Sequence, residues 1–283
     1  MRNLMGMELR KALRNPWLAI ALTIALGLAV ASAAGNIIYF LDNPIALYPH
    51  KFIPFTIGNC FKYWVSLDFI QPSSTLLFQL MPVLAVIPYA WSYRSELQSG
   101  YANQLMSRDR RERVLAAKAL AVFVSGALVA VIPLVVNFLL LACFIPAYLP
   151  DVVGVLYNAV YSQDLWAWFF YNLPVVYVVL FTLLAGVLSG LWATFVHALS
   201  FVVENRVVLL IAPQLGLLGL QFVNDKIYYA LGTICGVQLG LGQNMRAIAE
   251  TYLQSPQVIF GEGALMLLVA LVMTMCQVRR DVL

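Results

Sequence analysis

The amino-acid sequence predicts an all-α membrane protein. Of its 283 residues, 62% are hydrophobic and only 11% are charged, a composition typical of integral membrane proteins rather than soluble domains. The apolar runs are long enough for helices that cross a hydrocarbon core of roughly 30 Å, whereas barrel strands would be shorter and would alternate with period two. Because lipid offers no hydrogen-bond partner to backbone N–H and C=O groups, each run is expected to form a helix.

Six runs are long enough to be transmembrane helices. No internal repeat or low-complexity linker divides them, so residues 1–283 are expected to form a single transmembrane domain. Glu262 interrupts the last run near its predicted outer end. The predicted spans are 17–34, 76–93, 119–145, 169–196, 207–223 and 258–278.

The distribution of basic residues predicts the orientation of these spans. An even number of spans places both termini on one side, and most of the 17 Lys and Arg residues fall on that side. Only Lys51, Lys62, Lys226 and Arg246 fall on the other. By the positive-inside rule, both termini are predicted to be cytoplasmic and the chain to lie in the cell membrane. Because the basic residues follow the membrane face and do not alternate with aromatic residues, no nucleic-acid partner is expected.

The first sixteen residues predict an amphipathic helix on the inner membrane surface. Asn15 and Pro16 should end this helix just before the first span. The alternative is an ordinary basic flank that only orients the span. The predicted apolar face consists of Met5, Leu9, Ala12 and Leu13.

Two segments on the predicted outer side have open interpretations. The aromatic residues of the loop 42–75 suit anchoring at the membrane interface, although they could also line a substrate exit. The apolar segment 227–241 is short for a span and is interpreted as re-entrant or interfacial. Cys60 and Cys235 both map to this side and could form a disulfide, but two unpaired cysteines are an equal alternative.

The polar segment 94–118, between the second and third spans, is the most informative part of the chain. Its first half predicts a short helix with an apolar stripe. Ser95 is the expected N-cap of this helix, and Gly100 is expected to lower its stability relative to alanine. A turn is expected at residues 107–109, followed by a basic helix that continues into the third span. An apolar stripe that faces the cytoplasm needs lipid or a protein groove to cover it. The stripe consists of Leu97, Tyr101 and Leu105, flanked by Ala102 and Met106.

In these features the chain resembles the ABC-2 type permease family, the membrane subunits of ABC transporters. The likeness rests on the six-span layout, the N-terminal surface helix, the Glu96-x-x-x-Gly100 pattern and the Arg-rich turn that leads to Lys118. It implies a cytoplasmic coupling helix that seats in a cleft of a separate cytosolic ATPase, a second permease subunit as partner, and transport in the direction of export. The ATPase-coupling residues that it implies are Glu96, Leu97, Gly100, Tyr101, Leu105, Arg108, Arg110 and Arg111.

Several motifs are missing from the sequence. No G-x-x-x-x-G-K-[ST] phosphate loop occurs, so ATP and Mg²⁺ are expected on a partner chain and no cofactor or metal on this one. The spans hold almost no ionisable side chains, which disfavours an ion-coupled secondary carrier. A secondary carrier or a non-transport membrane scaffold remains the alternative.

Catalysis by this chain is not expected. Ser189-Gly190 is similar to the serine motif of rhomboid proteases, but the sixth span contains no histidine to activate the serine. We interpret Gly186, Ser189 and Gly190 instead as a contact of small residues between helices.

Overall fold

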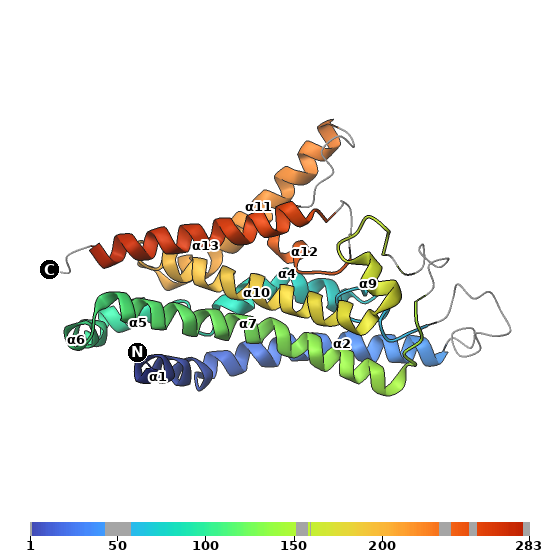
Figure 1. The fold of residues 1–283 in the computed structure, drawn as a ribbon, viewed down its shortest axis with the longest axis horizontal. Helices are drawn as coiled ribbons and strands as arrows, with labels where there is room; N and C mark the ends of the chain where they lie inside the picture. Colours follow the sequence, from blue (N-terminus) through green and yellow to red (C-terminus); the bar gives the residue numbers. More distant parts are fainter. Residues whose placement is uncertain are drawn as a thin grey trace.

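The computed structural model describes residues 2–42, 58–150, 158, 160–231, 239–248 and 254–279, and the regular secondary structure of these ranges is entirely helical. The long helices run side by side in one elongated bundle (Figure 1). In chain order the helices are α1 Arg2–Leu13, α2 Pro16–Asp42, α4 Pro72–Val86, α5 Ser92–Gln98, α6 Tyr101–Arg108, α7 Arg111–Phe144, α9 Ala167–Asn172, α10 Pro174–Leu199, α11 Arg206–Leu231, α12 Leu241–Asn244 and α13 Pro256–Arg279.

Proline residues begin several of the long helices. Pro16, Pro72, Pro174 and Pro256 are the first residues of α2, α4, α10 and α13. A proline fits this position because the N–H that it lacks would have no partner inside the helix. The expected break between the N-terminal helix and the first span at Asn15 and Pro16 is therefore confirmed.

The described part of the chain has five helices that are long and apolar enough to cross a membrane, namely α2, α7, α10, α11 and α13. These are the helices of a multi-pass membrane protein. The second predicted span differs: α4 has 15 residues, begins at Pro72 and ends at Val86 instead of covering 76–93. Side chains stabilise the turn that follows α4, because Asn15 donates to the carbonyl of Pro88 (2.7 Å) and the Trp91 indole donates to that of Ile87 (3.0 Å).

Helices α7 and α10 form the centre of the bundle, and small residues bring them close together. A Cβ atom on Gly190 would lie 2.8 Å from the carbonyl oxygen of Phe123, and one on Gly186 would lie 2.6 Å from Val131. Ser189 is fully buried on the same face of α10. The predicted small-residue contact is confirmed, since no larger side chain would allow this approach.

Helix α11 lies at the edge of the bundle. It packs mainly on α4 and α10, most of its described side chains are exposed, and its C-terminal part leaves the bundle (Figure 1). After α11 the chain returns to the bundle at α12, where a Cβ atom on Gly242 would lie 2.9 Å from the carbonyl oxygen of Phe78 in α4. Much of the predicted re-entrant or interfacial segment 227–241 lies outside the described residues.

Three aromatic residues in the described part of the first outer loop are buried in protein, whereas Phe69 is exposed. Phe61, Tyr63 and Trp64 have at most 4% of their surface exposed, and the Trp64 indole donates to the carbonyl of Leu134 in α7 (3.1 Å). Anchoring at the membrane interface is therefore wrong for these three aromatic residues. They are held inside because Asn137 of α7 accepts from the backbone N–H of the adjacent Val65 (2.9 Å).

Candidate functional site

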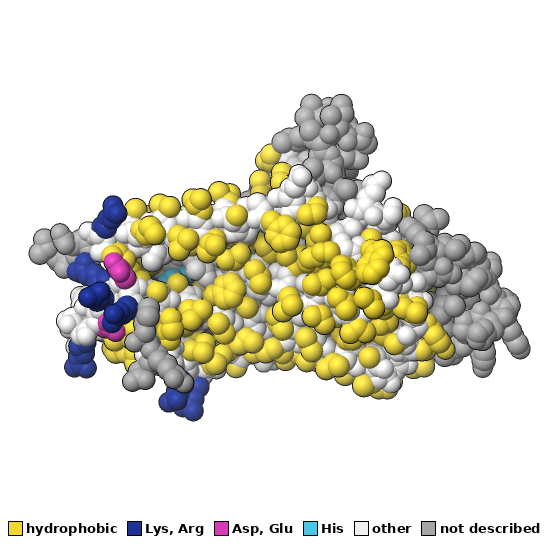
Figure 2. Space-filling model, viewed as in Figure 1, with side chains coloured by type: hydrophobic (Ala, Val, Ile, Leu, Met, Phe, Trp, Pro, Cys, Tyr) yellow, Lys and Arg dark blue, Asp and Glu magenta, His cyan; other side chains and the backbone are white. Residues whose placement is uncertain are grey.

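Most of the described basic side chains gather at one end of the bundle, which we call the basic end (Figure 2), whereas Lys62, Lys226 and Arg246 lie outside it. It contains α1, α5, α6, the first turns of α7 and the last turn of α13. Away from this end, the visible side of the bundle is mostly apolar (Figure 2). The basic end is the part of the molecule in which helices from the two halves of the chain meet the polar segment 94–118.

Four charged side chains form a closed ring at the basic end, which we call the charge square. Glu8 of α1 bonds Lys11 and Lys118, at 3.0 Å in each case. Glu96 of α5 bonds the same two ammonium groups, Lys118 at 2.7 Å and Lys11 at 3.5 Å. Because two carboxylates face two ammonium groups, the square carries no net charge and connects α1, α5 and α7.

Two tyrosines complete the hydrogen bonding of the charge square. The Tyr89 hydroxyl donates to Glu8 (2.9 Å), and Lys11 donates to the Tyr101 hydroxyl of α6 (3.1 Å). The Lys118 ammonium also lies 5.3 Å from the centre of the Tyr89 ring, within range of a cation–π interaction. Buried charges are tolerated only when they are paired and hydrogen-bonded in this way.

The surroundings of Glu8 and Lys11 favour the ionised forms of these two side chains. The Glu8 side chain is fully buried, and burial by itself would raise the pKa of the carboxyl. The ion pairs with Lys118 and Lys11 outweigh burial and hold the Glu8 pKa below its ordinary value. Burial likewise works to lower the pKa of Lys11, but bonds to Tyr101, Glu8 and Glu96 hold it above its ordinary value.

The segment 94–118 contains two short helices where one was expected. Gly100 has φ 76°, a left-handed conformation that separates α5 from α6. Ser95 is not an N-cap, because α5 begins earlier, at Ser92. The predicted basic helix is present as α7, but the turn before it lies at residues 109–110 instead of 107–109, because α6 continues to Arg108.

The segment α5–α6 also bonds the ends of helices in the second half of the chain. Arg94 pairs with Glu204 in the loop before α11. The first residue of α11, Arg206, donates to Ser95 (3.3 Å) and to Gln98 (3.2 Å). The last turn of α13 is attached as well, because Gln277 donates to the hydroxyl of Tyr93 in α5 (3.1 Å). Helices α1, α7, α11 and α13 therefore all have side-chain bonds to one short polar segment.

The apolar stripe of the segment faces this chain rather than the surroundings. Leu97 and Met106 are partly buried and pack against a cluster that contains Tyr93, Leu115 and Phe201. Leu97 and Met106 therefore need no outside partner, because the ends of the neighbouring helices cover them.

The structure divides the predicted coupling residues into two groups. Glu96 and Tyr101 point into the charge square, Leu97 packs on the apolar cluster, and Leu105, Gly100 and Arg111 are half-buried. Arg108 and Arg110 are exposed. The structure adds exposed polar residues that the stripe did not predict, namely Gln98, Ser99, Asn103, Gln104 and Ser107.

Sequence reasoning missed Glu8, Lys11 and Tyr89 as members of the site. One local feature of the sequence does point to Glu8. It is three residues after Met5 and four before Ala12, so it lies on the same helical face as these apolar residues. A carboxylate on a buried helical face requires a cation, and Glu8 has two: Lys11 on the same helix and Lys118, which the packing of α7 supplies.

No group of three or more His, Cys, Asp or Glu side chains suited to a metal ion occurs in the described ranges. Cys60 is buried and has no disulfide partner there, and the other member of the possible pair, Cys235, lies outside the described residues. In the charge square each charge is paired with charges on other residues, and these pairs join α1, α5 and α7.

Comparisons with known proteins give one match. No curated protein and no solved structure matches the chain. The model of one family, described as protein of unknown function (DUF2705), matches residues 52–282, which include α4 to α13 and thus Glu96 and Lys118 of the charge square. The chain therefore belongs to the DUF2705 family of proteins of unknown function.

Proposed function

We propose that this chain is the membrane subunit of an ATP-driven transporter of the ABC-2 permease type. The observation that carries the proposal is the bonding of the segment α5–α6 to the ends of four other helices. Under this proposal the basic end is cytoplasmic and a sixth span is built around α4. Two copies, or this chain and a similar one, form the path, and separate cytosolic ATPase subunits bind and hydrolyse ATP.

The bonding of the segment is suited to transmitting a force. Buried ion pairs resist separation, because breaking one leaves an unpaired charge at a cost of roughly 3–5 kcal/mol. A partner that moves α5–α6 would therefore move α1 and α7 through the charge square, in which Lys118 bonds Glu96 at 2.7 Å. It would move α11 through Arg206 and α13 through Gln277. A partner with different affinity for two positions of the segment would thereby bias two arrangements of the spans.

The exposed polar face of the segment is the proposed contact with the ATPase. Arg108 and Arg110 contribute positive charge to this face, and Asn103 and Gln104 contribute hydrogen-bonding groups. Glu96 and Tyr101, implied as contacts by the family resemblance, act in this proposal by holding the segment to the bundle. An acidic or polar cleft on the ATPase is the matching surface.

In-cell photo-crosslinking tests this contact. A photoreactive amino acid at position 103, on the exposed face of α6, should crosslink to a chain that contains a phosphate loop, identified by mass spectrometry. The same amino acid at position 215, an exposed apolar position of α11, is the control and should not give this product. If position 103 yields no ATPase in its native membrane, the chain is a secondary carrier or a scaffold and the proposal fails.

Charge reversal gives a second test of the same contact. Arg108→Glu with Arg110→Glu should abolish the crosslink from position 103, because both arginines lie on the proposed contact face. Arg10→Glu, an exposed arginine of α1 outside the segment, is the matched control and should preserve it. Equal crosslinking in all three proteins would contradict a contact through this face.

A further inference from the structure

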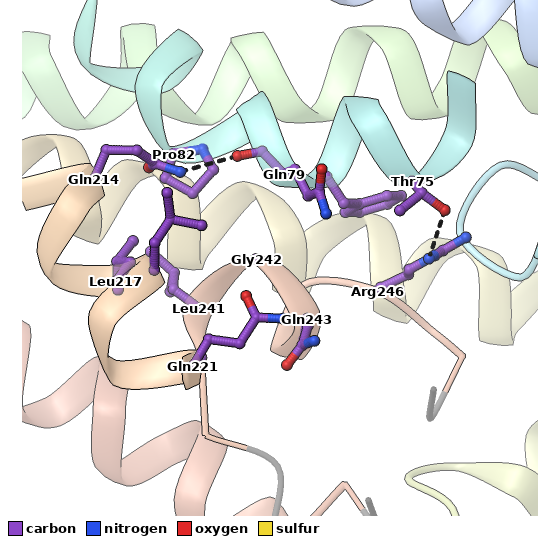
Figure 3. A pocket seen from close by; sticks show the side chains of 13 residues that line it. Thr75, Gln79, Pro82, Gln214, Leu217, Gln221, Leu241, Gly242, Gln243 and Arg246 are labelled. Carbon is purple, nitrogen blue, oxygen red and sulfur yellow. Dashed lines mark hydrogen bonds between the residues drawn. The ribbon is translucent and has the colours of Figure 1, made fainter. Parts of the chain in front are cut away.

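A cavity opens between α4, α11 and α12 (Figure 3). None of its lining residues belongs to the charge square. Its total empty volume, with the open mouth included, is about 550 Å³. The closed part is only a fraction of this volume, so it accepts a small chemical group rather than a whole ligand. The cavity exists because α12 returns to the bundle beside Phe78 while α11 leaves it.

Four glutamines line this cavity, which is otherwise mostly apolar. Gln79 comes from α4, Gln214 and Gln221 from α11, and Gln243 from α12 (Figure 3). The Gln214 amide nitrogen donates to the carbonyl of Gln79 (3.1 Å), which leaves its oxygen Oε1 buried without a partner. Oε1 of Gln243 is also buried without a partner. Unsatisfied buried acceptors cost free energy, and a ligand that donates hydrogen bonds would recover it.

A positive charge lies at the edge of the cavity and is held by neutral hydrogen-bond acceptors. Arg246 borders the cavity, and its guanidinium donates to the carbonyl of Asp68 and to the hydroxyls of Ser74 (2.8 Å) and Thr75 (3.4 Å). No carboxylate lines the cavity. A cationic ligand group would therefore lose its hydration beside a positive charge, and an anionic group would face the acceptor oxygens of Gln214 and Gln243, which cannot donate to it.

We propose that this cavity binds the uncharged, hydrogen-bond-donating group of an amphipathic ligand. Hydroxyl or amide N–H groups of the ligand donate to Gln214 and Gln243, and its apolar part lies along Leu217 and Leu218 of α11. Glycosides and amides share this chemistry, whereas ligands with anionic or cationic head groups do not. The interpretation of the cavity as a substrate site rests on the proposed transport function. Ligand binding by itself does not depend on an ATPase partner.

Photoaffinity labelling in phosphatidylcholine nanodiscs tests the proposal on the full chain. The probes are a dodecyl β-glucoside and an N-dodecanoyl glycinamide, each with a diazirine in the alkyl chain. The matched probes with a sulfate or a trimethylammonium head group are the charged controls. The neutral probes should label peptides from α4, α11 and α12, at least about fivefold more than the charged probes do. The relative labelling by glucoside and amide distinguishes the two sources of the shared chemistry.

Matched glutamine variants complete the test. Gln214→Leu with Gln243→Leu should reduce neutral-probe labelling of these helices about fivefold or more. Gln257→Leu, an exposed glutamine of α13, should leave it unchanged. Equal labelling by charged probes, unchanged labelling in the double variant, or wild-type labels confined to other helices would each overturn the proposal. If the double variant does not fold, the wild-type protein alone tests the proposal, through the helices that are labelled and the ratio of neutral to charged probes. Labelling in a protein that binds no ATPase would preserve the binding site and refute only the transport proposal.

Discussion

Removing Glu8 and Lys118 together should cost less than the sum of the two single removals, because the double variant removes a neutral pair of charges. Lys118→Met leaves the carboxylates of Glu8 and Glu96 with Lys11 as their single cation. Glu8→Gln leaves two ammonium groups with one carboxylate. The double variant keeps Lys11 and Glu96, a neutral pair at 3.5 Å, and replaces the other two charges by uncharged side chains of similar size.

The magnitude follows from burial. Lys118 and Glu8 have 1% and 0% of their side-chain surface exposed, so solvent screens their interaction very little. Each single variant should lower the free energy of unfolding by roughly 3–5 kcal/mol, because an uncompensated charge remains buried. The double variant should cost less than the sum of the two single variants by about 2–3 kcal/mol.

A double-mutant cycle measures this coupling. Unfolding by SDS in mixed micelles, followed by circular dichroism, gives the free energies of the four proteins. The control is the exposed pair formed by Asp109 and Arg113, with 28% and 44% of their side chains exposed, for which a coupling below about 0.5 kcal/mol is expected. Additive effects at Glu8 and Lys118 would refute the conclusion that the two residues form a buried ion pair.

Two further predictions concern pH and packing. Because the Glu8 pKa is lower in the folded protein than its ordinary value of 4.5, its contribution to stability is present above that value and is lost as pH falls through the folded pKa. The free energy of unfolding of the wild-type protein should therefore fall below about pH 4.5, and it should fall less in Glu8→Gln. An equal fall in both proteins would contradict the pairing of Glu8 with the two lysines. Gly190→Ala should lower the free energy of unfolding by roughly 1–3 kcal/mol, because the added methyl group would overlap with Phe123. Gly216→Ala, with nothing within 4 Å, is the control and should be neutral or stabilising by up to about 1 kcal/mol, so equal losses would argue against close packing.

Local features of the sequence predicted the fold wherever a local rule decides the structure. Pro16 ends one helix and begins the next because a proline has no N–H to donate. The small side chains of Gly186 and Gly190 predicted a close helix contact for a similarly local reason. The end of α4 at Val86 could not be predicted in this way. The turn that follows is stabilised by Asn15, more than seventy positions earlier in the sequence, through its bond to Pro88.

Local features of the sequence also predicted part of the candidate site, but not the contacts between distant segments. The polar segment was conspicuous in an apolar chain, and it contributes Glu96 and Tyr101 to the charge square. Its helical periodicity identified Leu97 as part of an apolar stripe, but periodicity does not show which surface covers a stripe. That surface is the protein's own, because the ends of α5, α7 and the loop after α10 meet there around Tyr93, Leu115 and Phe201.

The sequence by itself determined that the protein is helical and crosses a membrane. Lipid cannot satisfy a peptide group, so the length and composition of an apolar run are enough to predict its secondary structure. Only the tertiary structure decided which charges are paired. Glu8 and Lys118 are separated by 110 positions and meet because α1 packs on α7. Pairing of this kind depends on distances between helices, which neither composition nor periodicity contains.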